Sequence, residues 1–397
     1  MDGSRGEQRT ADGDAIARAR GVVPIVRAAK RGIEEQRALP TEVVAALHEA
    51  RLFRLMLPRS LGGEETDLLT FAKVLEILSE ADASVAWCVG QGGGCAMSAA
   101  FLEPAAAARL FGARDAVLAW GAGVQGTAVA VPGGYRVSGR WTFASGSRHA
   151  TLLGAHCRVV EADGTARLKP NGMPADRTAL LARDKAVIDD VWQVVGLKGT
   201  GSDSYEIRDL FVPEDETLDR ENQDELKVVS TLYRFPTMHA YAGGFAGVML
   251  GIAKGALADL RDLALKKTPR GAASSLRDSP VFQAELARME VRLRAARAYH
   301  HQMLAEAWAE VDGGQAFSLD RRVALRMSST HAINEGADIV HEVYRAAGQN
   351  AIFENAPFEQ RLRDALSASQ QVQGRPAHFV TAGRHLLGLA LDTAGFV

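Results

Sequence analysis

One segment indicates the fold more clearly than any other: Gly133-Gly134-Tyr135-Arg136-Val137-Ser138-Gly139-Arg140-Trp141-Thr142-Phe143-Ala144-Ser145-Gly146. It begins with a glycine turn, continues as a run in which apolar and polar residues alternate, and ends in a small hydroxyl residue before glycine. Alternation with period two predicts β-strand. About a hundred residues of helical pattern precede this segment and a long helical half follows it. The segment therefore belongs to a β module set between two helical blocks.

Working outward, the alternating pattern extends over roughly a hundred residues around this segment. The expected strands are 117–120, 127–131, 135–143, 152–160, 178–182, 187–191 and 205–212. Turn sequences rich in Gly, Pro, Asn and Asp separate several of them, as in Ala162-Asp163-Gly164. Short strands at this density predict a small antiparallel β-barrel or sandwich.

Helical periodicity returns after Pro213, and the expected helical blocks are 228–265, 279–311, 319–348 and 357–388. Blocks of this length with short breaks predict a helical bundle. The sequence thus predicts an α+β protein of three domains. These are an N-terminal α-helical domain (1–115), a middle β domain (116–225) and a C-terminal four-helix bundle (226–397).

Composition and charge narrow the functional classes. The 397 residues carry a formal net charge of −2, which provides no electrostatic footprint for nucleic acid or a membrane surface. Three cysteines without a CxxC pair argue against a disulfide framework and a structural zinc site, and fit a reducing cytoplasm. No histidine has metal-ligand spacing, so we expect no metal.

Two glycine patterns indicate close packing. Gly243, Gly247, Gly251 and Gly255 recur every four residues, which on a helix forms one ridge of small residues. The surrounding uncharged run, 240–253, is too short to span a bilayer, so we expect a buried helix with an unusually close neighbour. The triplet 92–94 has two interpretations, tight helix packing or a ligand-facing backbone. On the second, Gly93 and Cys95 would line a substrate pocket.

Several motifs occur in an order that is more specific than any one of them. They are Leu57-Pro58 with Leu61-Gly62-Gly63, Gly139-x-Trp141-x-Phe143-x-Ser145-Gly146, Gly199-Thr200-Gly201-Ser202 leading to Phe211-Val212-Pro213-Glu214, and Ala347-Gly348-Gln349 followed by Arg361-x-Arg363-Asp364-Ala365. With this order, the chain resembles the acyl-CoA dehydrogenase superfamily over nearly its whole length. The Trp-x-Phe-x-Ser-Gly form looks most like the branch of flavin-dependent monooxygenases that take reduced flavin from a partner reductase.

The resemblance implies a flavin, FAD or FMN, between the β module and the C-terminal bundle. A flavin ring needs a flat wall and a few hydrogen bonds that tune its electronics. By alternation, Trp141, Phe143 and Ser145 share one face of a strand. We therefore expect Trp141 to cover the ring and Ser145 to bind its N5, with Gly146 allowing close approach.

Other expected cofactor residues come from the family resemblance alone. Thr200 and Ser202 lie in the turn that supports the adjoining strand near the flavin. Arg270 and Gln283 resemble the arginine and glutamine that hold the flavin diphosphate. Gln349 resembles the residue that reaches a neighbouring subunit's cofactor, which implies a homo-oligomer, expected to be a tetramer.

The departures from the family pattern concern proton transfer. Removing a proton next to a thioester needs a carboxylate base, and the corresponding position here is best matched by Gln373-Gly374. Members of the monooxygenase branch often carry two histidines that help to transfer protons. The corresponding positions in this chain fall near Cys95 and Gln371, and neither of these residues is histidine. His378 is the nearby residue that could substitute. We therefore expect Ser145, Gln371 and His378 to be the catalytic residues and Gln373 to contact substrate.

Three functions remain open from the sequence. The first is a reduced-flavin-dependent monooxygenase of a small aromatic-like substrate, working with a separate flavin reductase. The second is an acyl-CoA dehydrogenase with a non-standard base. The third is a non-catalytic flavin-binding scaffold, because both usual catalytic constellations are altered.

Overall fold

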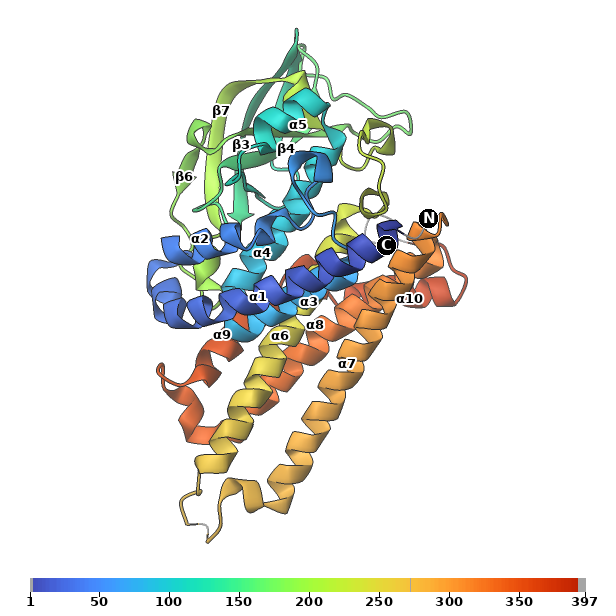
Figure 1. The fold of residues 1–397 in the computed structure, drawn as a ribbon. Helices are drawn as coiled ribbons and strands as arrows, with labels where there is room; N and C mark the ends of the chain where they lie inside the picture. The colour runs from blue at the N-terminus through green and yellow to red at the C-terminus, as the bar shows by residue number, and fades with distance from the viewer. Residues whose placement is uncertain (1–2, 272, 392–397) are drawn as a thin grey trace.

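The computed structural model describes residues 3–271 and 273–391. Helices come first, a sheet follows, and long helices complete the chain, as the sequence predicts (Figure 1). The N-terminal helices are α1 (Gly3–Gln36), α2 (Thr41–Glu49), α3 (Leu68–Ala81), α4 (Ala83–Ala96) and α5 (Pro104–Phe111). Among them, α1, α2 and α3 lie beneath the sheet and α5 lies beside it (Figure 1).

The middle region is one sheet with strand order β6-β7-β3-β2-β4-β5-β8, and β1 pairs with β4. Its strands are β1 (Leu118–Trp120), β2 (Gly126–Val131), β3 (Gly134–Ala144), β4 (Leu152–Val160), β5 (Asp176–Ala182), β6 (Val187–Asp189), β7 (Asp203–Pro213) and β8 (Thr217–Leu218). The sheet is mixed, because β4 runs parallel to both β1 and β2. The expectation of a purely antiparallel module is wrong, since alternation shows which residues share a face but not strand direction.

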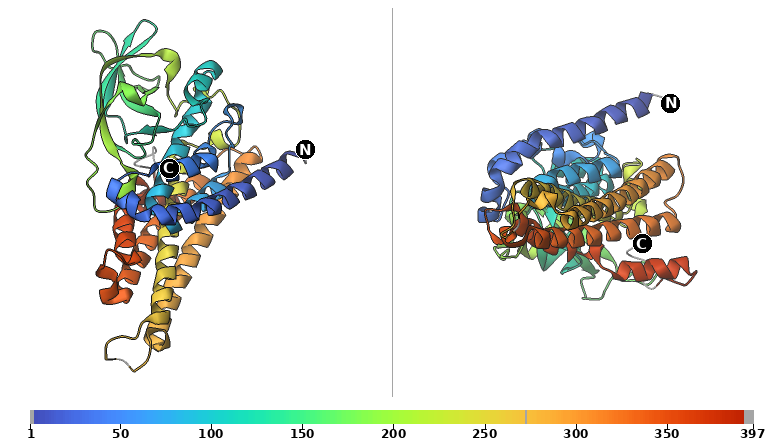
Figure 2. Two further views of the ribbon diagram at one scale, coloured as in Figure 1. Left: turned by 60° about the vertical axis from the view of Figure 1, so that its left-hand side comes forward. Right: turned by 90° about the horizontal axis from the view of Figure 1, so that it is seen from below.

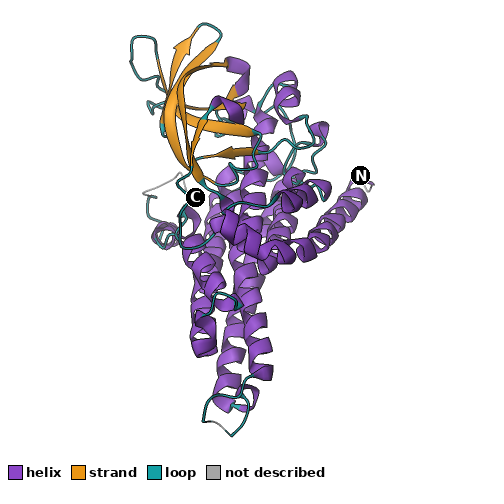
Figure 3. Ribbon diagram, turned by 90° about the vertical axis from the view of Figure 1, so that its left-hand side faces the viewer, coloured by secondary structure: helices purple, strands orange, loops and turns teal. Residues whose placement is uncertain are grey.

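The C-terminal region is built from α6 (Thr237–Lys266), α7 (Pro280–Asp312), α8 (Leu319–Ala347), α9 (Pro357–Ser369) and α10 (Ala377–Leu386). The bundle extends away from the sheet to a tip at the α6–α7 connection (Figures 2 and 3). The block expected at 357–388 is two helices, because Pro376 lies between α9 and α10 and disfavours helix in the residue before it.

Helix α6 is the central helix of the molecule. By length and composition it could cross a membrane, but 94% of its most apolar window is buried inside the protein, as in a soluble core helix. A Cβ on Gly247 would lie 2.5 Å from the carbonyl oxygen of Ala72, and one on Gly251 would lie 2.3 Å from that of Glu76. The glycine ridge therefore lets α6 contact the backbone of α3, which confirms the packing interpretation.

Candidate functional site

The end of β3 departs from regular strand geometry. The pairing of β3 with β7 shifts register between Trp141 and Ala144, and Phe143 has a φ of 64°. A bulky residue with positive φ is rare and marks a site where the surroundings hold the backbone. The shift turns the Phe143 side chain outward, where it is 62% exposed, and its ring meets that of Trp192 edge-on at 6.1 Å.

Trp141 lies on the other side of the sheet. It is fully buried, stacks on Tyr205 with ring centroids 5.4 Å apart, and donates its Nε1 hydrogen to the carbonyl of His156 at 2.9 Å. The expectation that Trp141, Phe143 and Ser145 share a face is wrong, because the bulge breaks the period of two. Phe143, not Trp141, presents a flat aromatic surface beside Ser145.

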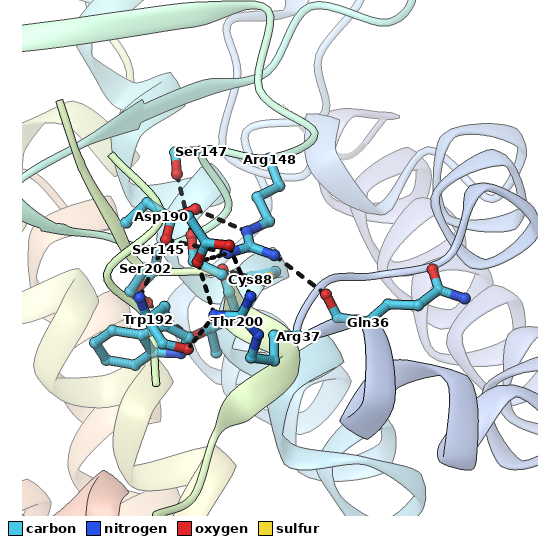
Figure 4. Close-up of polar contacts among 12 residues, drawn as sticks. Gln36, Arg37, Cys88, Ser145, Ser147, Arg148, Asp190, Trp192, Thr200 and Ser202 are labelled. Atoms are coloured by element: carbon cyan, nitrogen blue, oxygen red, sulfur yellow. Dashed lines mark hydrogen bonds and ion pairs between the residues drawn. The ribbon is translucent and has the colours of Figure 1, made fainter. Parts of the chain in front are cut away.

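Ser145 begins a chain of buried hydroxyl groups (Figure 4). Its Oγ lies 2.7 Å from that of Ser202, which lies 2.7 Å from Oγ1 of Thr200. Thr200 donates to the carbonyl of Leu197 at 2.8 Å, and Trp87 donates from Nε1 to Ser145 at 3.1 Å. The structure thus brings the three hydroxyl residues expected from the sequence into direct contact.

Gly146 ties the two turns of the site together. Its amide donates to the carbonyl of Thr200 at 2.8 Å. Its φ of 83° is one that glycine adopts without strain. This bond holds the end of β3 against the turn 199–202, so the hydroxyl chain is fixed by backbone as well as by side chains.

Leu197 connects this site to the C-terminal region. Its amide donates to Oδ1 of Asp364, at 2.6 Å, while its carbonyl accepts from Thr200. Burial, together with the neighbouring Asp82, raises the pKa of Asp364 to about 8. The Arg-Asp motif on α9 therefore supplies a largely protonated carboxyl that anchors the turn carrying the hydroxyl chain.

An ion-pair network fixes the same turn from the N-terminal side. Arg148 donates to the buried carboxylate of Asp203 at 2.7 Å and to Asp190 at 2.7 Å, and Arg37 from the end of α1 also binds Asp190 (Figure 4). The guanidinium of Arg148 reaches the Gln36 carbonyl at 3.1 Å as well. Three segments distant in sequence therefore converge behind Ser145, which gives the site a rigid support.

Aromatic side chains from α4 and α6 form a wall beside Ser145. Trp87 stacks on Phe245 with centroids 4.1 Å apart, and Phe245 stacks on Tyr241 at 5.5 Å. The Tyr241 hydroxyl lies 3.4 Å from Sγ of Cys95. Burial raises the pKa of the Cys95 thiol to about 12, so Cys95 is a neutral residue at the end of the wall and not a nucleophile.

Gly93 faces away from this wall. A Cβ there would lie 2.8 Å from the ring of Phe71, whereas one on Gly94 would meet the ring of Tyr241 at 2.3 Å. The placement of Gly93 as a substrate-facing residue is wrong. The glycine triplet allows large aromatic rings to pack against α4, which is the packing alternative.

The segment after α9 holds the two expected glutamines. Oε1 of Gln371 accepts from the amide of Gln373 at 2.9 Å, and its Nε2 is buried without a hydrogen-bond partner among the described residues. Gln373 is buried and accepts from Arg326. His378 donates from Nε2 to the carbonyl of Val372 at 2.7 Å, and burial lowers its pKa, so its ring is neutral near pH 7.

Three expected cofactor residues lie far from Ser145 in this chain. Arg270 and Gln283 are exposed at the α6–α7 connection, and Gln349 is exposed in the turn after α8. These segments form the tip of the bundle, opposite the sheet (Figure 1). A single chain does not bring them to the hydroxyl site, which leaves a neighbouring copy as the way they could contribute.

The sequence interpretation missed the aromatic wall and one cation. Arg220, after β8, lies over the ring of Trp120 with 5.0 Å from Cζ to the centroid. Its Nη1 is buried with no hydrogen-bond partner within the described part of the chain. Its charge acts on both Tyr241 and Cys95, which places it at the far end of the wall. Spacing suggests only that Tyr241 and Phe245, four residues apart, share one face of α6. The contact of Phe245 with Trp87 of α4 depends on the packed fold.

The residues at Ser145 suit a flavin. The exposed ring of Phe143 supplies a flat surface, and Ser145 supplies a polar atom of the kind that tunes flavin N5. Ser145 as a whole is 8% exposed, so the residue is buried without being sealed from the surface.

Sequence comparison places this chain among proteins of the acyl-CoA dehydrogenase family. Residues 18–110 match the family model of the acyl-CoA dehydrogenase N-terminal domain, and residues 243–373 match that of the C-terminal domain. Indole-3-acetate monooxygenase of Pseudomonas putida is 30% identical over 356 residues, 89% of each chain. The enzyme of the same name from Acinetobacter baumannii is 28% identical, with 91% of each chain covered.

A solved structure extends the match to three dimensions. XiaF from Streptomyces sp., in complex with FADH2 and glycerol, superimposes with a TM-score of 0.90 at 26% identity, covering 98% of both chains. The order of the three regions, the hydroxyl site at the end of β3 and these similarities lead to one conclusion. The chain belongs to the acyl-CoA dehydrogenase superfamily, in its branch of flavin-dependent monooxygenases.

Proposed function

We propose that this protein is the oxygenase component of a two-component system that hydroxylates an aromatic acid, using reduced FMN or FAD from a separate reductase. The observation that carries the proposal is the Ser145 hydroxyl site beside the outward ring of Phe143. The segment that would carry the base of a dehydrogenase holds Gln371 and Gln373 instead, and an amide cannot accept the proton. We therefore favour oxygenation over acyl-CoA dehydrogenation.

Reduced flavin would supply the electrons that activate molecular oxygen. The chain's own residues would hold and shield it: Phe143 against the ring, Ser145 at its N5, and Trp87 fixing the orientation of Ser145. His378, neutral and fixed through Nε2, and Gln371, with its buried Nε2, are the candidates for proton transfer and hydrogen bonding on the substrate side.

The proposed substrate is an aromatic ring that carries a carboxylate. The wall of Trp87, Phe245 and Tyr241 suits an aromatic ring, because stacked aromatic groups attract beyond their buried area. At the end of that wall, Arg220 offers a guanidinium edge that suits a carboxylate. The relatives at 30% and 28% identity bear the name of an enzyme for such a substrate, indole-3-acetate.

We also propose a homo-oligomer, with a tetramer as the preferred form and the cytoplasm as its compartment. The bundle tip carries Arg270, Gln283 and Gln349 together with four apolar side chains that are more than half exposed. Those side chains are Leu265, Val281, Ile352 and Phe353. A neighbouring copy would cover them and would bring the polar residues to its own flavin diphosphate. Light scattering tests the assembly, and Arg270→Ala should weaken flavin binding only if the copies assemble this way.

The decisive experiment mixes the protein with chemically reduced flavin, indole-3-acetate and ¹⁸O₂. Label in an organic product supports the proposal, whereas anaerobic bleaching of bound oxidised flavin by an acyl-CoA would overturn it. Arg220→Gln should raise the KM for indole-3-acetate roughly tenfold and leave that for indole-3-acetamide nearly unchanged. The matched control is Arg208→Gln, an exposed arginine paired with Glu206 on β7. Equal effects of Arg220→Gln on acid and amide would refute the carboxylate contact.

A further inference from the structure

The direction of each hydrogen bond in the Ser145 chain can be deduced from its far end. The carbonyl of Leu197 has no hydrogen, so Thr200, 2.8 Å away, must donate to it. A hydroxyl has one hydrogen, and that of Thr200 is then committed. Ser202 must therefore donate to Thr200, and Ser145 must donate to Ser202.

The other neighbour of Ser145 leaves the same direction in place. The indole Nε1 of Trp87 is only ever a donor, so it occupies one lone pair of the Ser145 oxygen. With its single hydrogen committed to Ser202, Ser145 retains one free lone pair and no free hydrogen. It is therefore an acceptor toward any further group that reaches its oxygen.

Burial makes this direction costly to reverse. Thr200 and Ser202 are 1% and 2% exposed, so bulk water does not reach them. If Ser145 turned its hydrogen outward, Ser202 would have to donate back to Ser145 or lose a partner. Thr200 would then lose its donor, or its hydroxyl oxygen would face the carbonyl oxygen of Leu197, 2.8 Å away, with a lone pair. That carbonyl also accepts from Nε1 of Trp192 at 3.0 Å and from the amide of Thr200 at 3.2 Å. The cost of reversal is therefore the repulsion between two oxygens at hydrogen-bond distance.

We propose that Thr200 and Ser202 are positioning residues that hold the hydrogen of Ser145 away from the site, so that Ser145 can only accept from flavin N5. This deepens the proposed function and rests on it. Reduced flavin carries a hydrogen at N5 and can donate it, whereas oxidised flavin presents a lone pair there. The chain of hydroxyls thus converts a serine, which could serve either form, into a group that discriminates between them.

The test compares the Kd of FMN with that of dithionite-reduced FMN under anaerobic conditions, and repeats both with FAD. In Ser202→Ala the hydrogen of Ser145 is free to turn toward oxidised N5. We expect oxidised flavin to bind about tenfold tighter and reduced flavin to bind with an unchanged Kd. The reduction potential of the bound flavin should fall by about 30 mV, which is the tenfold ratio converted for two electrons.

Two further variants separate the possible outcomes. Thr200→Val removes the last hydroxyl of the chain. It should lower the ratio of the Kd of oxidised flavin to that of reduced flavin, as Ser202→Ala does, which keeps the test valid if Ser202→Ala fails to fold. Ser147→Ala is the matched control, because this buried hydroxyl donates to the carbonyl of Gly201 in the same turn but outside the chain. Its ratio and potential should equal those of the native protein.

The results distinguish this inference from the proposed function. If Ser202→Ala and Thr200→Val bind flavin with the native ratio and potential, the positioning role is wrong and the flavin site stands. If the native protein binds neither form of FMN or FAD, both proposals fail. A change in ratio as large in Ser147→Ala as in Ser202→Ala also overturns the inference, because the effect would then come from general loosening of the turn.

Discussion

Replacing Asp364 with asparagine should remove a specific pH dependence from the stability of this protein. Asp364 has a folded-state pKa of about 8, raised by burial and by Asp82, whereas the carboxyl of an unfolded aspartate titrates near pH 4. The folded protein therefore keeps a proton that the unfolded chain releases. The contribution of Asp364 to the free energy of unfolding is greatest below about pH 4 and falls as pH rises from there to about 8.

The size of the effect follows from linkage. Each pH unit in this window is worth about 1.4 kcal/mol, which sets an upper limit of about 4 kcal/mol between pH 5 and 8. Asp82 is buried beside Asp364 and its pKa is also raised by burial, so the two carboxyls titrate together. We therefore expect Asp364 to account for about half of this limit, or roughly 2 kcal/mol. The amide in Asp364→Asn would keep the oxygen that accepts from Leu197 but has no proton to lose. The variant should match the native protein within about 1 kcal/mol at pH 5 and exceed it by about 2 kcal/mol at pH 8.

Urea unfolding monitored by circular dichroism at several pH values measures this directly. Asp163→Asn is the control, since Asp163 lies in an exposed turn and accepts from Thr165. Its profile should not flatten between pH 5 and 8. Parallel profiles for the native protein and Asp364→Asn across that window would refute the argument that Asp364 is protonated in the folded protein.

Three further substitutions test other features of the structure. Trp141→Phe should cost about 1–2 kcal/mol of stability, because it removes a buried hydrogen bond, and should leave the flavin Kd unchanged; a weakened Kd would restore Trp141 to the flavin site. Phe143→Ala should weaken flavin binding roughly threefold to tenfold with little change in Tm, since Phe143 is mostly exposed; titration with flavin and thermal melting decide. Gly251→Val should cost at least about 2 kcal/mol by overpacking the α3–α6 contact, whereas Gly383→Ala on α10, where a Cβ meets nothing within 4 Å, should not destabilise; equal melting temperatures for the two variants would contradict this.

Local patterns are enough to predict every described strand except the two-residue β8, and most of the helices. The strand predicted at 152–160 coincides with β4, and the helix predicted at 279–311 lies within one residue of α7 at each end. Strand direction could not be predicted, because parallel and antiparallel pairs bury the same alternating face. That Phe143 and not Trp141 faces outward beside Ser145 could not be predicted either. The bulge that causes it depends on pairing with β7 rather than on residues within β3.

In the candidate site, too, some features can be predicted from local motifs and others depend on the packed fold. Motifs identify Ser145, Thr200 and Ser202, and the structure places their hydroxyls in contact. The aromatic wall depends on how α4 meets α6, and the role of Asp364 depends on a contact with Leu197, 167 residues away in sequence. Pairings of this kind follow from the packed fold and leave no mark in a local pattern.

The contact between α3 and α6 bears on how substrate range could be altered in this protein. Two backbones that touch through glycine cannot move closer, and any side chain added at Gly247 or Gly251 would push them apart. Phe245 and Tyr241 also lie on α6, so the contact between α3 and α6 fixes the position of these two rings of the aromatic wall. Efforts to admit a wider ring are therefore better directed at the aromatic side chains themselves, where a change in width does not propagate into the scaffold.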